Sequence, residues 1–93
     1  MTVFWLPVAL AQIDRIETAR AQWSESSAER LSEAIFARGE QIGSFPYSGR
    51  LMPEFHVEHL REVLEQGLRI CYEVLPDRVE VFGVVSSRQD LFA

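Results

Sequence analysis

Residues 59–85, which read HLREVLEQGLRICYEVLPDRVEVFGVV, decide the fold of this chain. Three runs rich in β-branched and aromatic residues, at 59–64, 68–75 and 78–85, predict three strands with turns at Gln66–Gly67 and Pro76–Asp77. In the middle run two sets of side chains alternate: Leu68, Ile70, Tyr72 and Val74 against Arg69, Cys71 and Glu73. The stretch therefore predicts an antiparallel meander whose apolar face needs a cover.

The residues before the meander predict two helices that can pack on its apolar face. Apolar residues recur at steps of three and four over 7–22 and again over 27–42, which indicates two helices joined as a hairpin. Ser26 and Glu29 have the spacing of a capping box at the start of the second helix, and Pro7 suits the first turn of the first. Thr2–Trp5 predicts a short strand. The expected fold is α+β, with an N-terminal strand, a helical hairpin and a three-stranded antiparallel meander packed on the helices.

Length and composition narrow the classes of function. The 93 residues fit a single domain spanning 1–93. Nine basic residues, all arginine, stand against 14 acidic ones for a formal net charge of −5, so a protein partner is expected and direct DNA binding is not. Cys71 is the single cysteine, which suits a reducing cytoplasm. Neither a secretion signal nor a run of about 20 apolar residues is visible, so no membrane association is expected.

Four short motifs follow one another along the chain. They are a proline–x–x–glycine–arginine loop, a leucine–arginine–glutamate strand start, an arginine–isoleucine–x–tyrosine strand and a last apolar strand: Pro46, Gly49, Arg50, Leu60, Arg61, Glu62, Arg69, Ile70, Tyr72, Val79, Glu80, Val81 and Val84. In order and spacing they resemble the RelE/ParE superfamily of toxins, also called plasmid-stabilisation toxins, and the chain is closer to ParE. One stretch departs from the pattern. Many members end the last strand with histidine, glycine and two basic residues, where this sequence has Ser86, Ser87, Arg88 and Gln89.

The resemblance implies the toxin of a type II toxin–antitoxin pair, neutralised by a co-expressed antitoxin that wraps around it. ParE-like members inhibit DNA gyrase by binding, whereas RelE-like members cleave mRNA in the ribosome. The acidic charge and the missing histidine favour a ParE-like gyrase inhibitor that needs no cofactor. A RelE-like ribosome-dependent mRNA interferase and a degenerate, non-toxic binding module of the same fold are the alternatives.

A nuclease of this kind needs cations that hold the phosphate and stabilise developing charge, and the candidates are Arg61, Arg69 and Arg88. Strand parity turns Tyr72 and Arg69 to opposite faces, so Tyr72 is expected to pack inward with its hydroxyl bonded at the rim. Ser86 cannot shuttle protons near neutral pH as histidine can. We therefore expect binding rather than catalysis.

Two arginine features have both a functional and a structural interpretation. Arg61 and Arg69 are expected to share the open face, either as a pair for an acidic partner or a phosphate, or in salt bridges to Glu62, Glu65, Glu73 or Glu80. In the Pro46–Arg50 loop, Gly49 is expected at a positive φ, and Arg50 is expected to tie the loop to the sheet. We favour the salt bridges and the structural turn.

Five aromatic residues are more aromatic surface than a domain of this size easily buries: Phe4, Trp5, Trp23, Phe36 and Phe82. Most are expected in the core, and any that stay exposed would form an apolar groove for an antitoxin's helix or added strand. The expected partner-binding residues are Arg61, Arg69, Arg88, Trp5 and Trp23. His56 and His59 point to opposite faces of an extended segment, so no metal site is expected, and Cys71 is interpreted as a small sheet residue.

Overall fold

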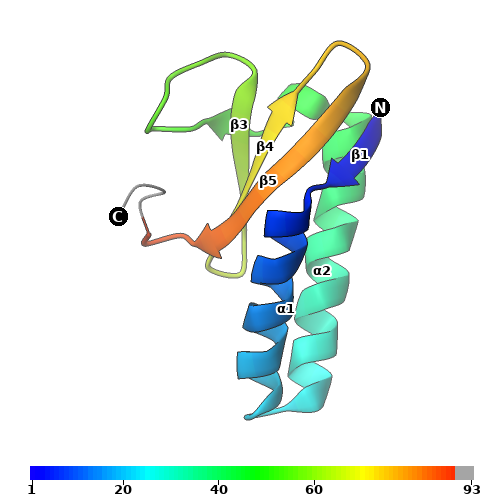
Figure 1. Ribbon diagram of the computed structural model, residues 1–93, viewed down its shortest axis with the longest axis vertical. Helices are drawn as coiled ribbons and strands as arrows, with labels where there is room; N and C mark the ends of the chain where they lie inside the picture. Colours follow the sequence, from blue (N-terminus) through cyan, green and yellow to red (C-terminus); the bar gives the residue numbers. More distant parts are fainter. Residues whose placement is uncertain (90–93) are drawn as a thin grey trace.

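A computed structural model describes residues 1–89 as a two-layer α+β fold, with two helices lying side by side against one face of a sheet (Figure 1). The elements follow in this order: β1 (Thr2–Trp5), α1 (Pro7–Ala21), α2 (Glu25–Ser44), a 3₁₀ turn (Pro46–Ser48), β2 (Arg50–Leu51), β3 (Leu60–Glu65), β4 (Leu68–Val74) and β5 (Arg78–Ser86). The expected strand, helical hairpin and meander are confirmed. None of the helices in this part of the chain is long and apolar enough to cross a bilayer.

The sheet has five strands in the order β1-β5-β4-β3-β2. β3, β4 and β5 form the predicted antiparallel meander, and β1 runs parallel to β5 with Trp5 opposite Val81. A parallel pair needs a long connection, and the helical hairpin and the meander lie between these two strands in the chain. β2 lies within the stretch expected to be a loop and pairs antiparallel with β3, with Arg50 opposite Glu62.

The turns of the meander explain its register. Gln66 and Gly67 both have positive φ, 49° and 81°, as in the two-residue turns whose twist matches that of paired strands. The predicted turn is confirmed, and glycine at the second position avoids the steric cost of a Cβ. Between β4 and β5 the register shifts at Cys71/Tyr72, which leaves Phe82 as a β-bulge.

Both helices begin at residues suited to that position, although α2 begins earlier than expected. Ser24 is the N-cap of α2, with extended backbone, and its hydroxyl accepts a hydrogen bond from Ser27 N at 3.2 Å. The expected capping box of Ser26 and Glu29 is therefore wrong, because Ser26 is already helical. Pro7 occupies the first turn of α1 as expected, and α1 ends at Ala21.

The core lies between the helices and the inner face of the sheet. Its buried side chains come from both layers and include Ile13, Leu31, Ile35, Ile70, Tyr72, Val79 and Val81. The alternation in β4 is confirmed, since Ile70, Tyr72 and Val74 belong to this cluster and Leu68 packs against it. No helix of residues 1–89 packs on the opposite face of the sheet, and the candidate sites are found on that face and at the edge formed by β1.

The expectation that most of the five aromatic residues lie in the core is wrong. Trp23 is 89% exposed in the turn between α1 and α2, which projects beyond the sheet (Figure 1). Phe4 and Phe36 are exposed, and Trp5 and Phe82 are half-buried. The core is filled by aliphatic residues and Tyr72, and Phe4 points to the face of β1 on which no helix of the described residues packs.

Candidate functional site

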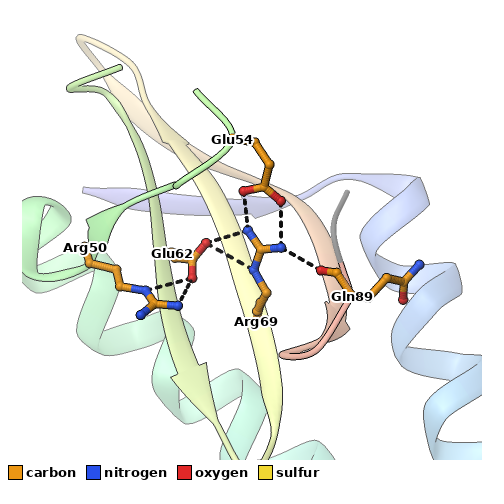
Figure 2. Close-up of polar contacts among 5 residues, drawn as sticks. All are labelled: Arg50, Glu54, Glu62, Arg69 and Gln89. Carbon is orange, nitrogen blue, oxygen red and sulfur yellow. Dashed lines mark hydrogen bonds and ion pairs between the residues drawn. The ribbon is translucent and has the colours of Figure 1, made fainter. Parts of the chain in front are cut away.

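The outer face of the sheet is organised around the guanidinium of Arg69, on β4. Arg69 is 4% exposed, and the side chains of Glu54 and Glu62 beside it are 5% and 0% exposed. Glu62 belongs to the neighbouring strand β3, whereas Glu54 belongs to the segment between β2 and β3. Figure 2 shows the two carboxylates on different sides of the guanidinium, so the segment carrying Glu54 folds over this part of the sheet.

All five N–H groups of Arg69 have an acceptor within the chain (Figure 2). Nε donates to Glu62 Oε1 at 3.1 Å, and Nη2 donates to Glu62 Oε1 and Glu54 Oε1, both at 2.6 Å. Nη1 donates to Glu54 Oε2 at 2.7 Å and to the backbone carbonyl of Gln89 at 2.8 Å. Since a guanidinium has five N–H donors, Arg69 is saturated by the chain itself.

The surroundings keep Arg69 charged. The hydrogen bond to Glu54 is the main cause that raises the pKa of Arg69 above its usual range, and Glu62 adds to it, while burial acts in the opposite direction. A buried charge is tolerated when its donors are matched, and removal of one partner leaves an uncompensated charge. Arg69 therefore clamps together β3, the segment before it and the residues that follow β5.

Arg50 completes the cluster on its exposed side. Its Nε and Nη2 donate to Glu62 Oε2 at 2.9 Å and 2.7 Å, so Glu62 lies between two guanidiniums (Figure 2). The expectation that Arg50 ties its loop to the sheet is confirmed. Arg50 is nevertheless 59% exposed, and its Nη1 has no partner among the residues that the structure describes.

Gly49 is required by a close approach and not by its backbone angle. Its φ is −73°, so the expected positive φ is wrong. A Cβ at this position would lie 2.5 Å from Tyr72 Oη and 2.6 Å from the carbonyl oxygen of Glu62. The loop can lie directly on β3 and β4 because this residue has no side chain.

Tyr72 faces the core as expected, with its hydroxyl bonded at the rim. The hydroxyl donates to the Pro46 carbonyl at 2.7 Å and accepts from Gly49 N at 3.0 Å. Burial is the main cause that raises the pKa of Tyr72. Since the hydroxyl is buried and its donor is used within the chain, Tyr72 is not placed to transfer a proton to a substrate.

Arg61 and Arg69 do not share a face, so that expectation is wrong. In the β3–β4 register Arg61 lies opposite Tyr72, whereas Arg69 lies opposite Leu64. Positions 61 and 64 have opposite parity on β3, so the two arginines point to opposite faces of the sheet. Of the expected salt bridges, Arg69 makes one with Glu62, and Arg61 makes none within residues 1–89.

Arg61 instead bonds to backbone carbonyls at the edge of the sheet. Its Nε donates to the carbonyl of Glu58 at 2.7 Å, and its Nη1 donates to the carbonyl of Gly49 at 3.1 Å. Its guanidinium carbon lies 5.2 Å from the ring centroid of Tyr47, within the range of a cation–π contact. These contacts give Arg61 a structural role beside the Pro46–Arg50 loop.

A hollow of about 250 Å³ opens beside Arg50, Glu54, Glu62 and Arg69, which we call the Arg69 cluster. It is lined by Arg50, Pro53, Glu54, Arg69, Ser87, Arg88 and Gln89. Arg88 is exposed, and its guanidinium has no partner in the described part of the chain. Ser86 is exposed, and its hydroxyl accepts a hydrogen bond from Arg88 N at 3.3 Å. Of the predicted cations, the structure therefore brings Arg69 and Arg88 together and replaces Arg61 by Arg50.

A second hollow, of about 420 Å³, lies between β1 and α2. It is lined by Met1, Val3, Trp5, Phe36, Gly39, Glu40, Gly43 and Ser44. Trp5 meets Phe36 edge to face with 4.8 Å between ring centroids, and it lies so close to Gly39 that a Cβ there would collide with the indole. We call this hollow the β1–α2 groove.

The free edge of β1 runs along this groove. Leu6 N donates to the Val81 carbonyl at 3.0 Å, so backbone groups of the same parity in β1 point toward β5. Val3 and Trp5 have the opposite parity, and their N–H and C=O groups point to the open edge. An unpaired edge beside an apolar groove can accept an added strand.

His56, His59 and Cys71, which were considered as metal ligands or as a reactive thiol, lie outside both hollows. His59 Nε2 lies 3.6 Å from Glu73 Oε2. The expectation that His56 and His59 lie in an extended segment is wrong, because His56 has a positive φ of 54° and turns flank it before β3 begins. Within residues 1–89 no three His, Cys, Asp or Glu side chains gather as metal ligands. Cys71 is buried, and burial is the main cause that raises the pKa of its thiol to about 12, which leaves it unreactive near neutral pH.

The sequence contained signals for part of the Arg69 cluster. Glu62 has the strand parity that points it to the same face as Arg69, and Arg50 was expected to tie its loop to the sheet. Glu54 was missed, because it lies in an irregular segment 15 positions from Arg69 and no local pattern connects them.

Comparison with known proteins shows which family model and which solved structures this chain resembles. A family model described as the ParE toxin of the type II toxin–antitoxin system, parDE, matches residues 3–91. Ten chains of solved structures are similar in fold. One, from the chromosomal ParDE toxin–antitoxin system of P. aeruginosa, is similar with a TM-score of 0.77 and 17% sequence identity, over 92% of this chain and 95% of that chain. At this identity the likeness concerns the fold. No curated protein matches the sequence significantly.

Proposed function

Because this chain belongs to the ParE toxin family of type II toxin–antitoxin systems, we propose that it inhibits DNA gyrase by binding and does not cleave RNA. The observation that carries the proposal is the saturation of Arg69, whose five N–H groups are all held by acceptors of the chain. A cation that stabilises a developing phosphate charge needs donors aimed at the substrate. Arg69 has no donor left for that task.

The other candidate groups for RNA cleavage do not converge. Arg61 lies on the face opposite Arg69, and the Tyr72 hydroxyl is bonded within the core. Ser86 stands where the resemblance to the RelE/ParE superfamily implies a histidine, and a serine hydroxyl does not titrate near neutral pH. These arrangements favour a binding surface over a nuclease site.

We assign the antitoxin contact to the β1–α2 groove. An extended antitoxin segment would pair with the outward backbone groups of Val3 and Trp5 and place an apolar side chain against Trp5 and Phe36. Trp23, the most exposed large apolar side chain in the described part of the chain, is the second aromatic anchor that we assign to the antitoxin.

The gyrase proposal is tested with purified DNA gyrase, relaxed plasmid and the purified chain, alone or with a co-expressed antitoxin. Supercoiling should stop with the chain alone and recover with the antitoxin, while transcripts in induced cells stay intact. Cleaved transcripts on ribosomes with unimpaired supercoiling would establish an mRNA interferase instead. Normal growth with neither effect would establish a non-toxic binding module.

The antitoxin contact is tested by Val3→Pro. Proline removes a backbone N–H that points to the open edge, so the pairing of β1 with β5 is retained. Antitoxin affinity should fall about tenfold while the melting temperature stays within a few degrees of wild type. Unchanged affinity in a folded variant would exclude strand addition at β1.

A further inference from the structure

We propose that the hollow beside Arg69 is the surface on which this toxin binds an acidic segment of its target protein. The inference rests on the proposed function, because it names the surface by which that function is exercised. The surface lies on the outer face of the sheet, whereas the β1–α2 groove lies at the β1 edge beside the helices. A toxin of this geometry presents separate surfaces to its antitoxin and to its target.

The charge of the hollow is opposite to that of the whole chain. Three of the nine arginines, Arg50, Arg69 and Arg88, line it. Glu54 and Glu62 beside them supply two carboxylates, so among the described residues one positive charge is in excess here, on a chain whose formal net charge is −5. A local positive potential on an acidic protein selects an anionic partner group and guides its approach.

The arginines of the hollow divide into one that holds the structure and two that face solvent. Arg69 uses all its donors to hold the surrounding segments. Arg50 Nη1 and the guanidinium of Arg88 have no acceptor among the described residues. A carboxylate that enters the hollow therefore meets charged donors from two different parts of the chain that residues 1–89 leave without an acceptor.

These two arginines are carried by backbone that is already fixed. Arg50 is held through its contacts with Glu62. The segment that carries Arg88 is closed by three bonds: Ser87 N donates to the Gly67 carbonyl at 2.8 Å, Gln89 N donates to the Ser86 carbonyl at 3.0 Å, and the Gln89 carbonyl accepts from Arg69 Nη1 at 2.8 Å. A surface that is ordered before binding loses less conformational entropy when a partner arrives.

A protein segment fits this surface better than a nucleic acid does. Binding to a phosphate backbone uses a row of cations, whereas this chain offers one hollow with a small positive excess. Leu64 lies opposite Arg69 in the register, on the same face, and is an exposed apolar side chain beside the cluster. Cations beside an apolar side chain match an acidic residue flanked by an apolar one, the mixture found in protein interfaces.

The test compares Arg88→Glu with the matched variant Arg30→Glu. Both arginines are exposed, neither side chain has a partner among the described residues, and both changes add the same negative charge. Arg30 lies on α2, outside the residues that line the hollow. Each variant is assayed for growth arrest after induction, for inhibition of purified gyrase, for antitoxin binding and for melting temperature.

We expect Arg88→Glu to lower the potency of growth arrest and of gyrase inhibition at least tenfold, and Arg30→Glu to stay within twofold of wild type. Both variants should bind the antitoxin and melt as the wild type does. The wild-type affinity for gyrase should fall more steeply with salt than that of Arg88→Glu, because one charge contact is missing from the variant.

The outcomes separate this proposal from the proposed function. Equal potency of the two variants in growth arrest would overturn the docking surface. Growth arrest without gyrase inhibition would overturn gyrase as the target, while the comparison of Arg88 with Arg30 would still decide whether the hollow is used. Transcript cleavage that Arg88→Glu abolishes would replace the acidic protein segment by RNA. A wild-type chain that arrests nothing would overturn both proposals.

Discussion

Each face of the sheet buries some of its side chains completely, but by opposite chemistry. On the inner face Ile70 and Tyr72 are completely buried under the helices by aliphatic neighbours. On the outer face Glu62 is also completely buried, but by two guanidiniums, and Arg69 is covered through its five hydrogen bonds. Apolar contacts have no fixed direction and adapt to small changes, whereas a buried charge depends on every partner. The two faces should therefore respond differently to substitution.

The largest difference is expected for Glu62→Gln. Removal of this charge leaves the buried Arg69 with Glu54 as its carboxylate partner and leaves Arg50 against a neutral amide, so the free energy of unfolding should fall by about 3 kcal/mol. The matched change on the inner face is Ile70→Val, at a completely buried position of β4, with an expected loss of about 1 kcal/mol. Urea unfolding followed by tryptophan fluorescence measures both. Equal losses would contradict the distinction between the faces.

The second prediction concerns Cys71, on the outer face. Burial raises the pKa of this thiol from 9.0 to about 12. In the unfolded chain the thiol loses its proton first, so the unfolded state binds fewer protons above pH 9 and the free energy of unfolding must fall as pH rises. The expected contribution between pH 8 and pH 10.5 is about 2 kcal/mol.

Urea unfolding at those two pH values measures this effect, with Cys71→Ala as the control. The variant should lose less stability between the two pH values than the wild type does, because it has no thiol to titrate. The comparison uses the change with pH and not the stability itself, which the smaller side chain also alters. Identical changes would mean that water reaches this side of β4.

The third prediction tests the close contact of Gly49, in the Pro46–Arg50 loop, with Tyr72 on β4 and Glu62 on β3. Gly49→Ala places a Cβ against Tyr72 Oη and the Glu62 carbonyl, so it should destabilise the fold by about 1–3 kcal/mol. Tyr72→Phe removes one of the two colliding atoms. The double variant should therefore lose less stability than the sum of the two single variants. Strict additivity in thermal or urea unfolding would show that the collision is relieved elsewhere.

The smallest effect is expected at a position outside both faces. Ser24→Ala removes the N-cap of α2 and should lower the free energy of unfolding by about 1 kcal/mol. Ser26→Ala, two residues later and exposed, should change it by less than about 0.5 kcal/mol. A larger loss at Ser26 than at Ser24, measured by urea unfolding, would restore the capping box that the sequence suggested.

One error about the candidate site could have been avoided from the sequence. The turn at Gln66–Gly67 was predicted, and it pairs Glu65 with Leu68 and therefore Arg61 with Tyr72. Since Tyr72 was expected to face inward, the same register turns Arg61 away from Arg69. Alternation relates the side chains of one strand to each other, and only the register relates them to the side chains of the next strand.

The sequence by itself determined the elements and their order apart from the 3₁₀ turn and β2, because each of the others is specified by a local pattern. Alternation marks β4, steps of three and four mark the helices, and a glycine with its neighbour marks the hairpin turn. The motifs at 46–50, 60–62 and 69–72 also pointed to the family that the match over residues 3–91 establishes.

Only the tertiary structure decided how distant segments cover one another. It paired β1 with β5, 76 positions apart at Thr2 and Arg78, placed Glu54 over Arg69, and put Gly49 against Tyr72 Oη. It also separated the β1–α2 groove from the hollow at Arg50 and Arg88. Local periodicity reports which way a side chain points within its own element. It contains no information on which loop folds over that side chain, because that depends on the summed packing and charge of the whole fold.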